Sequence, residues 1–222
     1  MLDRVLEPEA MDTEDEARDY DAMDHAGVNA RFVADFLAAH GPCRGGEVLD
    51  VGTGTALIPI GLARLDARAR IVGVDLAGSM LDLAASNVDR AGLADRIRLR
   101  AADAKALDVP DGRYEAVIAN TIVHHIPDPA PALAEMARVV APGGTVFVRD
   151  LARPSSGAEV VALVETHASG ETATARALFD ASLRAALTLG EARTLVERLG
   201  CPAEGVVLTS DRHWTWTWRR PG

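Results

Sequence analysis

From residue 47 onward, short apolar runs rich in β-branched residues alternate with longer stretches whose apolar positions recur at helical spacing. The short runs predict strands at 47–51, 70–75, 96–101, 114–120 and 145–150. The longer stretches predict helices at 56–65, 78–91 and 129–140. Strands that alternate with helices form parallel βαβ units with helices on both faces of an open sheet. We therefore predict an α/β protein with a doubly wound sheet.

The C-terminal third carries more helix than a simple βαβ unit needs. Three helical stretches follow the fifth strand, at 158–167, 174–187 and 190–199, where a minimal crossover requires one helix. The excess predicts a helical insertion at about 153–190. We expect this insertion to form part of a lid.

Two β-rich runs, 205–209 and 213–219, close the chain. In the second run Trp214, Trp216 and Trp218 alternate with other residues, so all three fall on one face of a strand. Because aromatic side chains bury large areas, we expect a packed sheet face rather than an aromatic cage. With these runs the prediction becomes a seven-stranded, mostly parallel sheet with an antiparallel closing strand.

The N-terminal region differs from the rest of the chain in charge. Residues 1–24 carry ten acidic side chains against two arginines, which accounts for −8 of the net charge of −10. A helix at 28–39 follows, with Val28, Phe32 and Phe36 at helical spacing. We expect an acidic arm and helix in residues 1–40 that form part of a cap. Residues 41–222 are expected to form the single structural domain.

Composition and charge restrict the classes of function. The chain has 222 residues, 48% hydrophobic and 25% charged, which is typical of a globular protein. An acidic arm repels phosphate backbones and anionic lipid, so we expect neither nucleic acid nor a membrane as partner. Cys43 and Cys201 are too few and too far apart for a disulfide framework or a thiolate zinc site, and no metal is expected. The sequence has neither a cationic leader nor a long apolar stretch, so we expect a cytoplasmic protein. We expect it to be a monomer or a homodimer.

The most informative stretch is the turn after the first strand, which contains Asp50, Gly52, Thr53 and Gly54. Glycines let the backbone approach a ligand closely, and the N-terminus of the following helix offers free N–H groups. The turn therefore predicts a nucleotide-like cofactor. A dinucleotide fingerprint would need a glycine at position 57, where the chain has Leu57, and Asp50 would repel a pyrophosphate. NAD is disfavoured on both counts.

Two further acidic residues lie at strand ends. Asp75 ends the second strand, where a carboxylate can accept both hydroxyls of a ribose. Asp103 follows the third strand and can accept a hydrogen bond from an adenine amino group. Two carboxylates without a phosphate clamp favour a cationic, phosphate-free nucleoside, and S-adenosylmethionine fits this description.

These motifs together resemble those of the class I S-adenosylmethionine-dependent methyltransferases of the methyltransferase domain 25/11 type, which have a Rossmann-like fold. The resemblance covers residues 48–148. It rests on D-x-G-x-G at 50–54, V-G-V-D-L at 72–76, A-A-D-A at 101–104 and E-M-A-R-V-V-A-P-G-G at 135–144. One departure is Ala56, which stands where many members have a third glycine.

The resemblance assigns roles around the cofactor. It implies that Gly52 and Gly54 bracket the methionine part and that Asp75 holds the ribose. It further implies that Met80 or Leu76 packs on the adenine. The complete set of expected cofactor-binding residues is Asp50, Gly52, Thr53, Gly54, Asp75, Leu76, Met80, Asp103, Ala104, Asn120, Tyr20 and Met23.

A second, local resemblance lies in the acidic arm. The segment Tyr-Asp-Ala-Met-Asp at 20–24 is similar to the Y-D-x-M-N segment ahead of the ubiquinone and menaquinone C-methyltransferases. In those proteins this segment lies over the cofactor. The resemblance implies that Tyr20 and Met23 help to close the site, and it makes Tyr20 a candidate catalytic residue.

Residues on the substrate side are expected just after the fourth strand. Asn120, His124 and His125 follow this strand, whose carboxyl end faces the ligand crevice in open α/β sheets. Either histidine is a candidate catalytic base, because its ordinary pKa permits proton transfer near neutral pH, although either can equally cap or pack locally. Arg149 and Asp150 end the fifth strand on the same side and can pair with each other.

Methyl transfer from a sulfonium is an in-line displacement, so positioning supplies much of the rate and only some nucleophiles need a base. The Asn/Asp-Pro-Pro-aromatic loop used on planar amines is absent, because the fourth strand ends Ala-Asn-Thr-Ile at 119–122. We predict an S-adenosylmethionine-dependent methyltransferase with a small-molecule acceptor, and oxygen, sulfur and carbon nucleophiles all remain open. The rival interpretations are a nucleotide-dependent oxidoreductase of similar fold and a non-catalytic S-adenosylmethionine-binding protein.

Overall fold

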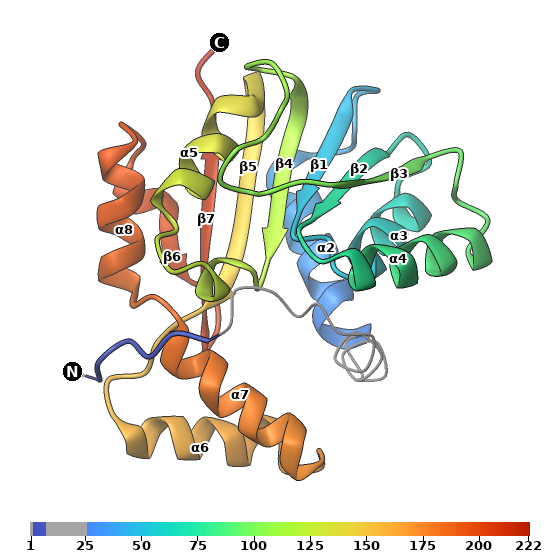
Figure 1. Cartoon of the computed structure of the whole chain (residues 1–222). Coiled ribbons are helices and arrows are strands. Elements are labelled where there is room, and N and C mark those ends of the chain that lie inside the picture. Colours follow the sequence, from blue (N-terminus) through green and yellow to red (C-terminus); the bar gives the residue numbers. More distant parts are fainter. Residues whose placement is uncertain (1, 8–25) are drawn as a thin grey trace.

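The computed structural model describes residues 2–7 and 26–222, so the predicted site residues Tyr20 and Met23 lie outside the described part of the chain. Its centre is a seven-stranded sheet in the order β3-β2-β1-β4-β5-β7-β6 (Figure 1). The strands are β1 (Glu47–Val51), β2 (Arg70–Asp75), β3 (Ile97–Ala101), β4 (Tyr114–Asn120), β5 (Val140–Leu151), β6 (Val206–Leu208) and β7 (His213–Arg219). Only β7 runs antiparallel to its neighbours in this sheet. The predicted fold class is confirmed.

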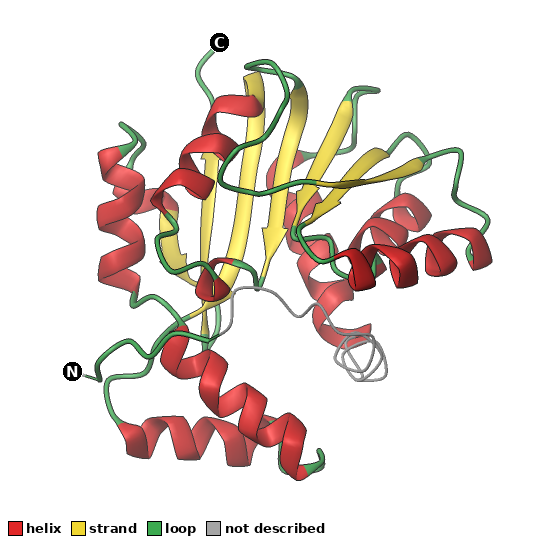
Figure 2. Ribbon diagram, in the orientation of Figure 1, coloured by secondary structure: helices red, strands yellow, loops and turns green. Residues whose placement is uncertain are grey.

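Helices cover both faces of the sheet (Figure 2). On one face lie α2 (Ala26–His40), α3 (Leu57–Leu65) and α4 (Gly78–Arg90). On the other face lie α5 (Ala130–Val139) and α8 (Leu189–Arg198). The sheet is therefore the middle of three layers, as the alternation of strands and helices predicts.

Each face of the sheet has its own core. On the α2 side, the rings of Phe32 and Phe147 meet edge to face with their centroids 5.2 Å apart. On the α5 side, Trp214 and Trp216 are fully buried, and Trp218 packs against the same cluster. The predicted packed tryptophan face is confirmed.

A pair of helices, α6 (Gly157–His167) and α7 (Ala173–Ala185), lies beyond the carboxyl ends of β4 and β5 (Figure 1). The two helices share a small apolar cluster that includes Val160, Val164 and Leu183. In contrast, α8 packs on α5 and beside β6, so α8 makes the crossover that the sheet requires. The helices in excess of a minimal crossover are α6 and α7.

The fifth strand begins earlier than the sequence predicts. The Pro-Gly-Gly stretch at 142–144 indicates a turn, yet β5 starts at Val140 and runs through it. Gly143 has a φ of 72°, and a Cβ on Gly144 would lie 2.7 Å from the backbone oxygen of Glu115. The glycines therefore produce an irregular pairing with β4 and a close approach to it, rather than the end of a strand.

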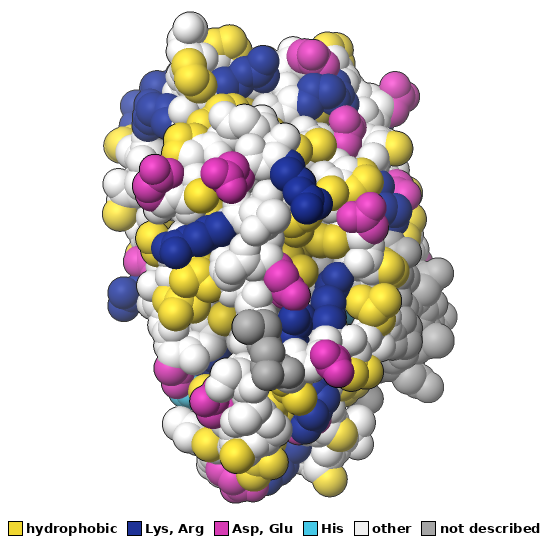
Figure 3. Space-filling view, turned by 90° about the vertical axis from the view of Figure 1, so that its left-hand side faces the viewer, with side chains coloured by type: hydrophobic (Ala, Val, Ile, Leu, Met, Phe, Trp, Pro, Cys, Tyr) yellow, Lys and Arg dark blue, Asp and Glu magenta, His cyan; other side chains and the backbone are white. Residues whose placement is uncertain are grey.

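The surface is mixed in charge. On the face shown in Figure 3, Lys and Arg side chains are interspersed with Asp and Glu. None of the described helices combines the length and the apolar character needed to cross a bilayer.

Candidate functional site

The turn between β1 and α3 depends on its two glycines. Gly52 and Gly54 have φ angles of 71° and 53°, in the region that favours glycine. A Cβ at Gly52 would come within 2.4 Å of the Ile122 side chain, so this position also requires glycine for space. The backbone N–H of Gly54 donates to Asp75 Oδ2 at 2.8 Å. This bond holds the turn against the end of β2.

Ala56 occupies the same left-handed region, with a φ of 63° and a fully buried side chain. The sequence resemblance marks this position as one where glycine is usual. The structure gives the reason: the chain needs a left-handed residue there to enter α3, which begins one residue later, at Leu57. Alanine adopts this conformation at a cost of about 1–2 kcal/mol.

Asp50 and Thr53 lie behind the turn and do not line the cavity in front of it. Asp50 is 2% exposed, and its Oδ2 accepts a hydrogen bond from Thr53 Oγ1 at 2.8 Å. Burial raises the pKa of Asp50 to about 7, and the nearby Asp75 carboxylate adds to this, whereas the Thr53 hydroxyl opposes it. Asp50 thus supports the turn from inside and can change its charge near neutral pH.

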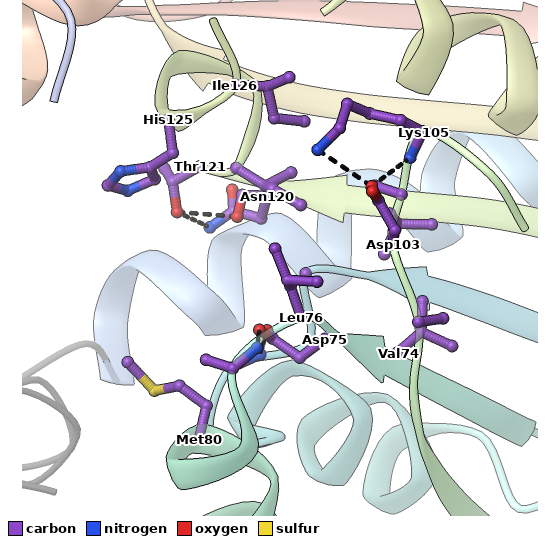
Figure 4. A pocket seen from close by; sticks show the side chains of 17 residues that line it. Val74, Asp75, Leu76, Met80, Asp103, Lys105, Asn120, Thr121, His125 and Ile126 are labelled. Carbon is purple, nitrogen blue, oxygen red and sulfur yellow. Dashed lines mark hydrogen bonds and ion pairs between the residues drawn. The ribbon is translucent and has the colours of Figure 1, made fainter. Parts of the chain in front are cut away.

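An open cleft enclosing about 810 Å³ lies at the carboxyl ends of β1 to β4 (Figure 4). It brings together most of the residues that the sequence places at a cofactor site. Those on its wall are Gly52, Gly54, Asp75, Leu76, Met80, Asp103, Ala104 and Asn120. The candidate base His125 also lines it. We name this space the donor cavity.

The two acids of the donor cavity already have partners. Asp75 Oδ1 accepts the backbone N–H of Ala77 at 3.0 Å, in addition to the Gly54 bond. Asp103 accepts the backbone N–H of Lys105 at 2.8 Å and pairs with its ammonium at 3.1 Å (Figure 4). These contacts, the backbone bond first, lower the pKa of Asp103. Both carboxylates are therefore fixed as hydrogen-bond acceptors.

The sequence prediction did not include Lys105. Its position two residues after Asp103 could have indicated it, because a side chain there can fold back on the acid. Lys105 also lines the donor cavity, so a cofactor that bonds to Asp103 meets the lysine as well.

Asn120 lies on the wall of the donor cavity, next to Thr121 (Figure 4). Its side-chain Oδ1 is buried and has no hydrogen-bond partner among the described residues. The next residue, Thr121, has a φ of 54° and donates its hydroxyl to the backbone oxygen of Asn120 at 2.8 Å. An unpaired buried acceptor at a bend of this kind fits a ligand that supplies a donor.

A second open cleft, of about 1150 Å³, adjoins the first, and we name it the acceptor cavity. Asn120, Thr121 and His125 line both cavities. Its other walls come from α2, α6, α7 and β7, and they mix apolar and polar groups. The apolar members are Val28, Leu151, Ala168, Ala175, Leu178 and Phe179. The polar members are Asn29, His124, His167, Glu171, Ser182, Arg212 and His213.

His124 forms a buried pair with Asp150. His124 Nδ1 lies 2.6 Å from Asp150 Oδ1, and both residues are at most 3% exposed. Asp150 also accepts the backbone N–H groups of Val123 at 2.6 Å and Leu151 at 2.7 Å. Burial alone would favour the neutral forms. The pair nevertheless raises the pKa of His124 and lowers the pKa of Asp150, because each charge stabilises the other.

Arg149 does not pair with Asp150, contrary to the alternative drawn from their adjacency. Neighbouring residues of a strand point to opposite faces. Arg149 therefore reaches Asp35 in α2 at 2.8 Å and Thr215 in β7 at 3.0 Å, while Asp150 faces His124.

The described histidines are not grouped as the ligands of a metal ion. Among residues 2–7 and 26–222, no group of three or more His, Cys, Asp or Glu side chains is arranged to hold an ion. His213 bonds to the Ser210 hydroxyl at 2.8 Å, and burial followed by the Arg212 charge lowers the pKa of His213 to about 4. His213 is therefore neutral at physiological pH.

Comparisons with known proteins agree with this geometry. Residues 49–148 match the family model described as "Methyltransferase domain". Phosphatidylethanolamine N-methyltransferase of Cereibacter sphaeroides is 40% identical over 111 residues, which is 50% of this chain and 53% of that protein. Demethylmenaquinone methyltransferase of Thermus thermophilus is 37% identical over 112 residues, 50% of each chain. The chain thus spans about half the length of the curated relatives it matches.

Solved structures extend the likeness to nearly the whole fold. A structure named as an S-adenosylmethionine-dependent methyltransferase from Aquifex aeolicus superposes with a TM-score of 0.69 at 16% identity, covering 92% of this chain and 97% of that one. The cyclase SpnF has a TM-score of 0.63 at 18% identity, covering 99% of this chain and 89% of that one. At these identities the likeness concerns the fold alone.

The matched segment and the fold point to one class of enzyme, the S-adenosylmethionine-dependent methyltransferases. Residues 49–148, which include the motifs at 50–54, 72–76 and 101–104, match a methyltransferase domain, and the fold is like that of a structure named as such an enzyme. S-adenosylmethionine is the cofactor of this class. The donor cavity fits it, since two fixed carboxylates and an unpaired amide oxygen offer acceptors. Lys105 also lines the cavity, but its ammonium is paired with Asp103.

Proposed function

We propose that this protein transfers a methyl group from S-adenosylmethionine to a small-molecule acceptor. The observation that carries the proposal is the junction of the two cavities at Asn120, Thr121 and His125. One cavity suits the cofactor, and the other is open beside it. A donor and an acceptor held in adjoining spaces can meet in line, which is the main requirement of methyl transfer.

Residues of the donor cavity would hold the cofactor. Asp75 would accept the ribose hydroxyls, and Asp103 the adenine amino group, with Met80 and Leu76 against the ring. When bound, S-adenosylmethionine supplies an electrophilic methyl group on a sulfonium. Tyr20 and Met23 remain predicted closing residues of this cavity.

The acceptor cavity favours a compound with an apolar body. Leu178 and Phe179 of α7 and Val28 of α2 offer apolar contacts, and histidines line the same cavity. Curated relatives are named for quinone and phosphatidylethanolamine methylation, which gives a precedent for such acceptors. We propose an acceptor whose oxygen, sulfur or carbon nucleophile faces His125.

We propose that the two histidines control the removal of a proton from the acceptor. His124, held by Asp150, is favoured in its charged form and can donate a hydrogen bond. His125 lies between the cavities and can accept a proton from a protic nucleophile. We further propose that residues 1–40 together with α6 and α7 form the cap that excludes water from both cavities.

Calorimetric titration with S-adenosylhomocysteine and with NADH tests the donor half of this proposal. We expect S-adenosylhomocysteine to bind and NADH not to bind, because the cavity has acceptors for a nucleoside and no clamp for a pyrophosphate. Binding of NADH alone would instead favour an oxidoreductase and overturn the proposal.

A further inference from the structure

The first described residues of the chain contact two segments that line the acceptor cavity, the loop after β4 and α7. Residues 2–7, which we name the N-terminal strap, run beside the carboxyl-terminal end of α7 and reach the loop after β4 (Figure 1). The backbone N–H of Leu2 donates to Ser155, and that of Val5 donates to Arg184, both at 3.1 Å. The strap is thus hydrogen-bonded to the segments at both ends of the α6–α7 pair.

One side chain of the strap joins the histidine loop to α7. Arg4 donates to the backbone oxygens of Pro127 at 2.9 Å, Ile126 at 3.0 Å and His124 at 3.2 Å, all in the loop that carries the histidines. It also donates to Ala185, the last residue of α7, at 2.6 Å. Because an arginine presents its donors in a rigid fork, one side chain fixes the spacing of these two walls of the acceptor cavity.

The strap also brings a carboxylate to the second histidine. Glu7 Oε2 lies 3.7 Å from His125 Nδ1, and the Glu7 side chain is 9% exposed. Its other oxygen, Oε1, is buried without a hydrogen-bond partner in the described part of the chain. A carboxylate beside Nδ1 favours the tautomer with the proton on that nitrogen, which leaves Nε2 as an acceptor.

The two imidazoles lie next to each other, tilted by 37°, and each has a carboxylate nearby. Their centroids are 4.1 Å apart, with Asp150 of β5 on His124 and Glu7 of the strap near His125. The Arg4 guanidinium also faces this group. Its charge opposes protonation of His124, whereas the charges of Asp150 and Glu7 favour protonation. Of the two rings, only that of His125 lines both cavities.

We propose that the strap is a working part of the acceptor site, with Arg4 and Glu7 as positioning residues. Arg4 fixes the backbone of the histidine loop, and Glu7 holds His125 in the tautomer that accepts a proton at Nε2. The acceptor's proton then moves to Nε2, and the electron pair it leaves stays on the nucleophilic atom. This inference rests on the proposed function, because it assigns the base of that reaction.

Imidazole NMR tests the assignment without any acceptor. The 15N shifts and titration midpoint of His125 are measured in the wild type, in Glu7→Gln and in Asp3→Asn. Asp3 is exposed on the same strap, so its substitution removes one negative charge without touching the histidines. We expect neutral His125 to carry its proton on Nδ1 in the wild type. In Glu7→Gln this preference weakens and the midpoint moves to lower pH, whereas Asp3→Asn changes neither.

A second variant tests the clamp. In Arg4→Gln we expect faster hydrogen exchange at the amides of His125 and Ile126, which bond within the loop that Arg4 holds. The strap proposal is overturned if His125 has the same tautomer and midpoint in Glu7→Gln as in the wild type. Calorimetry with S-adenosylhomocysteine separates this result from the underlying function, because a wild type that does not bind it overturns the proposed function whatever the NMR shows.

Discussion

At the scale of single residues, the buried pair of His124 and Asp150 makes stability depend on pH. The raised pKa of His124 adds stability below the ordinary histidine value of 6.5, and this is lost as pH rises through the folded value. The lowered pKa of Asp150 adds stability above the ordinary value of 3.8, and this is lost as pH falls. The pair therefore stabilises most between these two values.

Asp150→Asn should remove this contribution. Near pH 5 we expect the free energy of unfolding to fall by about 3–5 kcal/mol, as for a broken buried ion pair. As the pH rises through the folded pKa of His124 the loss should become smaller, because the histidine is then neutral in both states. Urea unfolding of both proteins over a series of pH values from 5 upwards measures the difference. A loss that does not change with pH would show that the pair is not charged in the folded protein.

Asp75 gives the residue-scale test of the donor cavity. Replacing it with alanine removes the acceptor proposed for the ribose, and we expect S-adenosylhomocysteine to bind about 1–3 kcal/mol more weakly. Asp82→Ala is a matched control, because it removes the same charge from an exposed position on α4. Calorimetric affinities that are equal for the two variants would contradict the ribose assignment.

At the scale of elements, the glycine turn is where sequence and structure agree most closely. Gly52 has a positive φ and no room for a Cβ beside Ile122. Gly52→Ala should therefore lower the free energy of unfolding by at least about 1–2 kcal/mol and also weaken S-adenosylhomocysteine binding. Gly157→Ala, at the open first turn of α6, should leave both nearly unchanged. Thermal unfolding and calorimetry measure the two effects. If Gly52→Ala changes neither the stability nor the affinity, the turn is not part of the cofactor site.

Sequence patterns predicted the elements because strand and helix periodicity are local properties. Two of the predicted acids, Asp75 and Asp103, met the glycines at one cavity because parallel strands end at the same edge of the sheet. Asp50 instead lies behind the turn. Contacts between segments that are far apart in the sequence produce no such local pattern. Nothing local links Arg4 to Ile126 or His124 to Asp150, and these pairs depend on how the strap and β5 pack after folding. The run of β5 through Pro142 escaped prediction for the same reason.

At the scale of the whole molecule, the fold admits more than one chemistry. A solved structure that superposes over 99% of this chain is named a cyclase, so a sheet of this topology does not by itself establish methyl transfer. The argument for transfer comes instead from the arrangement of two joined cavities with His125 at the junction.

The most direct measurement of the central claim is the fate of a labelled methyl group. The protein is incubated with S-adenosylmethionine carrying an isotope-labelled methyl and a small-molecule cell extract, and the products are read by mass spectrometry. We expect the label in one compound that has gained one methyl group, together with S-adenosylhomocysteine, and a far lower yield from His125→Ala. Tight binding of the cofactor with no labelled product in any extract fraction would contradict methyl transfer and leave a non-catalytic binding protein.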